Sequence, residues 1–255
     1  VCVAGAQAPV FERREAPRPE TDQASGADPV EVALEAMDAR ALVGQLMLVT
    51  MQGRQDPSMD ELAFLEAYRP GGVVIGKLLK PSRAAVYITK LRGLERATGI
   101  PLLIGGDLYR LSQRDRGYPS AFVQLPTLLS LSAADEAETT ERLGRMLAEH
   151  MRVMGFNLNL GPSLALAPTL SEAPGSIHHF GSDPHFAAEA GVSLINSFRD
   201  AGVMPMAMDF PGGAANRVGR TPAVLLTPKP SLPEADLLPF VRAIEAEVPL
   251  LHVGN

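Results

Sequence analysis

Short apolar runs alternate with longer amphipathic segments from about residue 28 to the end of the chain. The apolar residues in each run are nearly continuous rather than alternating with polar ones, as in strands that are buried on both faces. The predicted strands are Gly44–Met51, Gly71–Lys77, Ile100–Asp107, Phe156–Pro162, Val203–Asp209 and Val248–Asn255. Such strands, separated by helical segments, predict a parallel β/α architecture.

The segments between the apolar runs carry the start and stop signals of helices. The predicted helices span 58–69, 80–99, 132–155, 183–202 and 231–247. Ser58 and Glu61 have the spacing of a capping box, as do Ser231 and Glu234. Ser132 is the predicted cap of the third helix, which is strongly amphipathic.

Two arrangements of such units compete, an open doubly wound sheet and a TIM-type (β/α)8 barrel. No G-x-G-x-x-G turn follows the first predicted strand, so the dinucleotide-binding form of the open sheet has no support. Polar residues recur at the carboxyl ends of the strands, the rim at which barrels place their active sites. These residues are Lys77, Asp107, Asn159, Asp209, His252 and Asn255. About six strand–helix units are present where a barrel has eight, so the expectation is either an incomplete barrel or an open sheet.

Composition narrows the functional classes. The 255 residues carry a formal net charge of −6, and no cluster of Lys and Arg indicates a nucleic-acid partner. No apolar run reaches the roughly 18 residues that a transmembrane helix needs. The single cysteine, Cys2, offers neither an internal disulfide nor a cysteine-based zinc site. We therefore expect no cofactor and no metal, and nothing in the sequence indicates an oligomeric state.

The first residues differ in character from the rest of the chain. Val1–Ala8 are mostly small and apolar and end in Ala-Gly-Ala-Gln-Ala, like the end of a secretory signal with its A-x-A site. Two alternatives to a secretory signal are lipidation at Cys2 and a disordered N-terminus that carries no targeting signal. We divide the chain into residues 1–29, a signal remnant and disordered linker, and 30–255, the barrel. The expected location is periplasmic or envelope-associated, or cytoplasmic if the start has no targeting meaning.

Five segments occur in an order that is itself informative: GGVVIGK, IPLLIGGD, GFNLNLGP, FGSDP and DFPGG. Together they resemble the N-terminal barrel of family-3 glycoside hydrolases, and most of all its bacterial β-N-acetylhexosaminidase branch. The resemblance covers roughly Met37 to Asn255. It implies retaining hydrolysis of a β-linked N-acetylglucosaminide, such as a cell-wall glycan, by an aspartate nucleophile. It also implies a general acid from an Asp/His pair on a flexible loop.

The resemblance assigns candidate site residues. Asp107 matches an aspartate that binds sugar hydroxyls, and Asn159 ends another matched strand at the same rim. His178 stands where the family has an arginine. The family's Lys-His-Phe-Pro-Gly-His-Gly turn reads Met-Asp-Phe-Pro-Gly-Gly-Ala here, so Asp209 replaces a substrate-contacting histidine. We predict that all four residues bind substrate and that Asp209 is the candidate catalytic residue.

His178 and His179 also have a simpler interpretation. Adjacent histidines have poor spacing for a metal site. Apart from the resemblance, the pair is predicted to consist of two solvent-facing loop side chains.

The same resemblance predicts impaired catalysis. The lysine and both histidines of the family's turn are missing beside Asp209, and Ala215–Leu226 contains neither an acid nor a histidine where the family has its proton donor. The family's nucleophile strand follows Val248–Asn255, at which this sequence ends. Whether the chain is an enzyme stays open between a non-catalytic sugar-binding or scaffold module and a hydrolase that uses Asp107 and Asp209 as its carboxylate pair. A metal protein is the least favoured class.

Overall fold

The computed structural model describes residues 28–51, 56–76, 81–98, 100–107, 125–134, 136–167, 176–212 and 233–253. The chain divides into two compact units, residues 1–36 and 37–255. The described part of the first unit is helix α1 (Pro29–Glu35), whose Val30 amide donates a hydrogen bond to the Asp28 side chain (2.9 Å). Among the described helices, none has the length and hydrophobicity that a membrane span requires.

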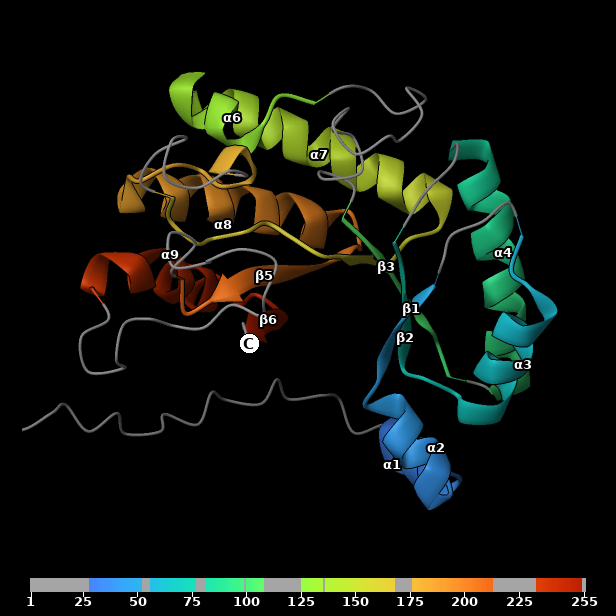
Figure 1. Ribbon diagram of the computed structural model, residues 1–255. Coiled ribbons are helices and arrows are strands. Elements are labelled where there is room, and N and C mark those ends of the chain that lie inside the picture. Colours follow the sequence, from blue (N-terminus) through green and yellow to red (C-terminus); the bar gives the residue numbers. More distant parts are fainter. Residues whose placement is uncertain are drawn as a thin grey trace, which may run out of the picture. The chain divides into compact units, whose positions relative to one another are not determined.

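The second unit is built on a sheet of six parallel strands (Figure 1). They are β1 (Leu48–Met51), β2 (Gly72–Ile75), β3 (Leu103–Gly106), β4 (Leu158–Asn159), β5 (Met204–Phe210) and β6 (Leu250–Val253). Each strand pairs with its neighbour in sequence, in the order β1-β2-β3-β4-β5-β6. A doubly wound sheet reverses its strand order, whereas a barrel does not. The predicted incomplete (β/α) barrel is therefore confirmed, and no pairing joins β1 to β6 within the described residues.

Helices precede β1 and connect the later strands, and they lie outside the curled sheet (Figure 1). They are α2 (Ala39–Gln45), α3 (Met59–Tyr68), α4 (Pro81–Thr98), α6 (Leu128–Ala134), α7 (Ala137–Met154), α8 (Pro184–Asp200) and α9 (Glu234–Glu245), with a short 3-10 turn η2 (Ser176–His178). Figure 1 shows α7, α8 and α9 following one another around the strands. Their apolar faces, with those of α4 and the strands, form one continuous core.

Of the two predicted helix caps that lie in the described residues, Ser58 is confirmed and Ser132 is wrong. Ser58 forms the capping box, since its Oγ accepts from the Glu61 amide (3.1 Å) and its own amide donates to the Glu61 carboxylate (2.8 Å). Ser132 caps nothing, because it lies inside α6, a separate helix held by buried leucines. Helix α9 begins at Glu234 with Pro233 as its N-cap, and Ser231, the other predicted cap, lies outside the described residues.

The first predicted strand also began too early. Gly44 belongs to α2, and a Cβ there would lie 2.0 Å from the carbonyl oxygen of Tyr68 at the end of α3. The glycine therefore marks a close approach of two backbones.

The pairing of β3 with the two-residue strand β4 has side-chain support. The Asn157 carboxamide accepts a hydrogen bond from the Ile104 amide (2.6 Å) and donates one to the Leu102 carbonyl (3.0 Å). The Asn157 side chain thus takes the place of a paired strand residue just before β4 begins. It fixes the position of β4 relative to β3.

Candidate active site

A cavity of about 220 Å³ lies at the carboxyl ends of the strands. All four predicted site residues, Asp107, Asn159, His178 and Asp209, line it, and so does His252 from the end of β6. Parallel strands bring their carboxyl ends to one edge of the sheet, which is why residues so distant in sequence meet there. Of the predicted rim residues, Lys77 and Asn255 lie outside the described residues, as do Ala215–Leu226.

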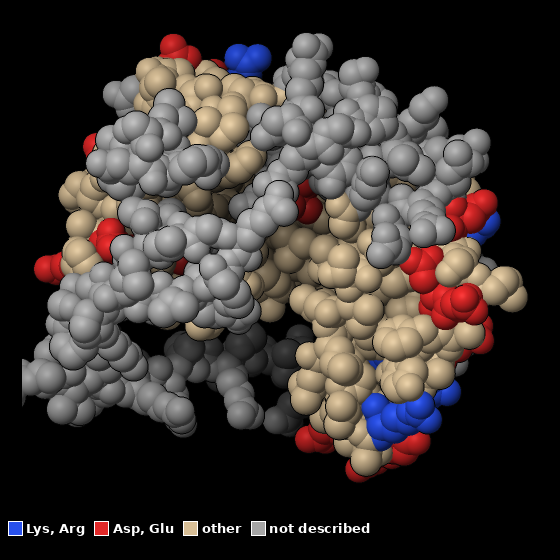
Figure 2. Space-filling view, viewed as in Figure 1, with Lys and Arg blue, Asp and Glu red and all other residues tan. Residues whose placement is uncertain are grey.

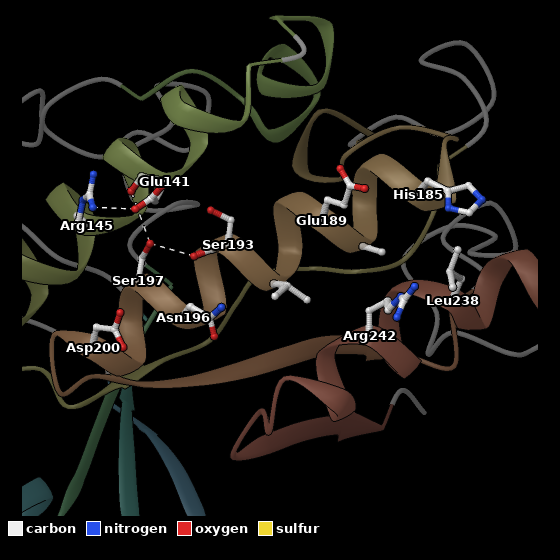
Figure 3. A pocket seen from close by; sticks show the side chains of 12 residues that line it. Glu141, Arg145, His185, Glu189, Ser193, Asn196, Ser197, Asp200, Leu238 and Arg242 are labelled. Carbon is white, nitrogen blue, oxygen red and sulfur yellow. Dashed lines mark hydrogen bonds and ion pairs between the residues drawn. The ribbon is translucent and has the colours of Figure 1, made fainter.

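A larger hollow of about 650 Å³ lies elsewhere, along the outer side of α8 between α7 and α9 (Figure 3). Its charged side chains include Glu141 and Arg145, which pair with each other at 2.7 Å. Arg242, at the same hollow, pairs with Glu245 (2.9 Å). Because this surface holds none of the strand-end residues, the smaller cavity is the candidate active site.

Charged side chains of both signs lie on the surface. Figure 2 shows acidic and basic side chains interspersed among the described residues of the visible face. Within the described lining of the cavity the ionisable side chains are two aspartates and two histidines. No group of three or more potential metal ligands occurs in the part of the chain that the structure describes.

Asp209 owes its position to an irregularity near the end of β5. The register between β5 and β6 shifts between Ala207 and Phe210, and Asp209 takes a left-handed backbone conformation with φ 72°. Its carbonyl accepts a hydrogen bond from the Gly212 amide (2.7 Å), which closes the turn. A residue other than glycine at positive φ is strained, although aspartate tolerates it better than most, so the backbone here is held by its surroundings.

The side chain of Asp209 is 7% exposed and belongs to a small hydrogen-bonded group. Ser163, which forms a bridge beside Met208 of β5, donates its hydroxyl to the Asp209 carboxylate (2.5 Å). The same Ser163 oxygen lies 2.8 Å from Nδ1 of His179. Three segments of the chain therefore meet at one buried carboxylate.

The prediction that His178 and His179 are solvent-facing loop residues is wrong. His178 and His179 are each only 7% exposed, so neither is a solvent-facing loop residue. The turn η2 packs on α6, and the buried Phe180 anchors the chain directly after it. Sequence pattern did not reveal Ser163 at all, because nothing in its own neighbourhood marks a serine as a partner of a carboxylate 46 residues away.

The remaining lining residues have distinct roles. Asn159 is buried, and its amide donates to the Gly161 carbonyl (3.0 Å), which supports the turn after β4. His252 accepts a hydrogen bond at Nδ1 from the Asp209 amide (3.4 Å), so its proton is carried on Nε2 when the ring is neutral. Asp107 follows β3 directly and is half-buried. The cavity thus presents two carboxylates and two imidazoles to a bound molecule.

One further carboxyl group lies near the rim without lining the cavity. A Cβ placed on Gly212 would lie 3.4 Å from the Cβ of Asp236 in the first turn of α9. Burial raises the pKa of Asp236 above its usual value. Asp236 therefore packs against the turn that follows Asp209.

Comparison with known proteins agrees with this architecture. The family model of the glycosyl hydrolase family 3 N-terminal domain matches residues 39–253. A β-N-acetylhexosaminidase from Beutenbergia cavernae DSM 12333 superposes with a TM-score of 0.69 at 21% identity, over 85% of this chain and 67% of that one. A glycoside hydrolase family 3 β-N-acetylglucosaminidase from Paenibacillus sp. str. FPU-7 superposes with a TM-score of 0.71 at 23% identity, over 85% of this chain and 41% of that one.

A glycosyl hydrolase of the same family from Mycobacterium smegmatis str. MC2 155 gives a TM-score of 0.60 at 24% identity, over 70% of this chain and 52% of that one. The chain thus spans between about two fifths and two thirds of the length of these solved structures. No protein of curated function gives a significant match to the sequence. Since the family model covers most of the chain, this protein belongs to glycosyl hydrolase family 3, whose N-terminal domain it contains.

Proposed function

We propose that this domain binds one N-acetylglucosamine unit of a β-linked, cell-wall type glycan, and that hydrolysis at its site is strongly impaired. The observation that carries the proposal is that Asp107, Asn159, His178 and Asp209, from four separate segments, line one cavity at the strand ends. Pockets for drug-sized ligands measure about 300–1,000 Å³, so a cavity of about 220 Å³ suits a smaller ligand such as one sugar ring.

The chemistry of the lining supports a sugar. Carboxylates accept hydrogen bonds from hydroxyl groups, and imidazoles can donate or accept them. Phe198 and several aliphatic residues supply the apolar part of the wall. A sugar ring, which carries hydroxyl groups around an apolar face, matches such a mixed surface.

Impaired hydrolysis follows from what the site residues can supply. No lysine or arginine is among the described residues that line the cavity. His178 cannot reproduce the two parallel hydrogen bonds of an arginine. A retaining glycosidase needs a nucleophilic carboxylate and a proton donor about 5 Å apart. Asp107 and Asp209 are the carboxylates of the described lining, so we propose that the remaining turnover uses this pair.

Binding and hydrolysis are tested on the same variants. Titration with N-acetylglucosamine, followed by NMR, is expected to shift signals of cavity residues in the wild type. Asp107→Asn should raise the Kd by about tenfold or more, since a hydrogen bond to a charged group contributes roughly 1.5–3 kcal/mol. Asp200→Asn, at the outer hollow, is the matched control and should leave the Kd unchanged. Shifts confined to the outer hollow, or none at all, would overturn the proposal.

Hydrolysis is measured with 4-nitrophenyl N-acetyl-β-glucosaminide. We expect very slow release of nitrophenol that falls further in both Asp107→Asn and Asp209→Asn. Rapid turnover that survives Asp209→Asn would show that the impairment, and the role of Asp209, are wrong.

The second candidate function is a non-catalytic interaction module of the cell envelope. One observation favours it: Leu46 and Met47, just before β1, and Leu48, its first residue, are exposed at the edge of the sheet. Exposed apolar residues at such an edge are typical of a protein contact. Absence of sugar binding together with a stable protein complex would favour this function. The location in the envelope stays a prediction, because the residues that suggest it lie outside the described ones.

A further inference from the structure

Ser163, His179 and Asp209 form a hydrogen-bonded chain whose last member faces the cavity. The Ser163 oxygen lies 2.8 Å from His179 Nδ1 and 2.5 Å from Asp209 Oδ2. A serine hydroxyl carries one proton, so it can donate to only one of these neighbours at a time. When Ser163 donates to a charged Asp209, its oxygen accepts a hydrogen bond from His179, whose Nδ1 then carries a proton.

We propose that this chain is a proton relay that loads Asp209 with the proton it presents to a bound glycoside. The identity of that acceptor rests on the proposed function. His179 takes up a proton from solvent and becomes an imidazolium ion. It then passes the Nδ1 proton to Ser163 while Ser163 passes its own hydroxyl proton to Asp209 Oδ2. The products are a neutral imidazole with its proton on Nε2 and a carboxylic acid at Asp209, so charge and protons balance.

Burial and backbone geometry support a working role for the relay. His179 and Asp209 are each 7% exposed, and burying ionisable side chains is costly unless partners compensate. The bond from Ser163 to Asp209 is as short as charge-assisted O–H···O bonds are. The strained φ of 72° at Asp209 is the kind of outlier that occurs at functional sites.

The relay joins a buried carboxyl group to a buried imidazole through one serine hydroxyl. Asp209 is then the catalytic residue, while Ser163 and His179 act through it as positioning residues.

Other titratable groups surround the relay. Asp107, His178 and His252 line the same cavity, and Asp236 lies against Gly212 in the turn after Asp209. Helix α8 contributes the apolar Leu194 and Phe198 to the wall. The measurement must therefore follow His179 individually, since a bulk pH profile would mix these groups.

The test is an NMR titration of ¹⁵N-labelled histidine side chains between pH 4.5 and 8.5, with His179 assigned by the His179→Asn variant. In the wild type we expect protonated Nδ1 on His179 through the acid part of the range. Asp209→Asn should lower the midpoint of the His179 titration by about one pH unit, because the opposite charge nearby is lost. In a Ser163→Ala background the same Asp209→Asn change should move the midpoint much less.

Two variants keep the result interpretable. Ser163→Thr retains the hydroxyl and should restore the coupling, whereas Ser193→Ala, at the outer hollow, should leave the His179 titration unchanged. An unchanged midpoint in Asp209→Asn, or full coupling in Ser163→Ala, would overturn the relay. Titration with N-acetylglucosamine on the same samples separates the two proposals. Coupling without sugar binding refutes the proposed function alone, and sugar binding without coupling refutes the relay alone.

Discussion

Asp209 and Tyr87 are both buried polar side chains, but their polar atoms meet different surroundings. The Asp209 carboxylate accepts a hydrogen bond from Ser163 and lines the cavity. The Tyr87 hydroxyl lies in the core between helix and sheet, and it has no hydrogen-bond partner among the described residues. Burial, and to a lesser degree the charge of Glu61, raises the pKa of Tyr87 to about 12. The Asp209 carboxylate therefore has a hydrogen-bond partner that offsets its burial, whereas the Tyr87 hydroxyl destabilises the core.

Replacing Tyr87 by phenylalanine should stabilise the protein. Removal of an unsatisfied buried hydroxyl is expected to raise the free energy of unfolding by about 1 kcal/mol at neutral pH. Unfolded tyrosine loses its proton near pH 10, whereas Tyr87 in the folded state keeps it to about 12. The unfolded state therefore binds fewer protons in this window, and the stability of the wild type falls between pH 10 and 12.

Urea unfolding of the wild type and Tyr87→Phe at pH 7, 9 and 11 measures both effects. The difference between the two proteins should widen at pH 11, because the variant lacks this titration. A constant difference would show that Tyr87 is not protected from ionisation by the fold.

At the scale of elements, the contact between α7 and α8 depends on a glycine. A Cβ on Gly144 would lie 2.8 Å from the Cβ of Ser197 and 2.9 Å from the Cδ2 of Leu194, closer than packed carbon atoms come. Helix α8 also packs on β5, which carries Asp209. The distance between the two helices therefore affects the position of the strand that bears the candidate catalytic residue.

Gly144→Ala should destabilise the protein by roughly 1–3 kcal/mol, because the added methyl group forces the two helices apart. Gly93→Ala is the matched control. Gly93 is also a helical glycine, in α4, and a Cβ there would meet nothing within 4 Å. Its replacement should be stabilising by about 0.5–1 kcal/mol from helix propensity alone. Thermal unfolding of both variants measures these changes in stability. Equal effects of the two substitutions would contradict close packing at Gly144.

At the scale of the second unit, the sheet is not closed by pairing between described strands. β1 and β6 are its outer strands, and each has a neighbour on one side only within the described residues. Leu46, next to β1, is 87% exposed. Unpaired strand edges with apolar neighbours are templates for pairing with another chain.

The 255-residue chain should therefore self-associate in solution. Sedimentation analysis is expected to give a mass above the 27.1 kDa of one chain, and Leu46→Lys should reduce it. Val153→Lys, at an exposed apolar position (76%) on α7, is the matched control and should have no effect. A monomeric wild type would show that the open edge is protected.

Much of this architecture could be predicted from the chain itself. Continuous apolar runs mark strands buried on both faces, and their alternation with amphipathic helices leaves few arrangements other than a parallel sheet. The rim residues Asp107 and Asp209 were predictable for the same reason, since each directly ends an apolar run. The helix start at Ser132 was predicted wrongly, because buried leucines hold Ser132 inside α6, a separate helix.

The sequence by itself therefore determined the class of fold, the order of its elements and the residues that end its strands, because each of these depends on local chemistry. Only the tertiary structure decided that the sheet winds in sequential order, that His178 and His179 are buried, and that Ser163 joins His179 to Asp209. These features depend on contacts between segments 16 to 46 residues apart, which pack together only when the strands have paired. The bulge that turns Asp209 toward the cavity likewise comes from the register between β5 and β6, which no local pattern specifies.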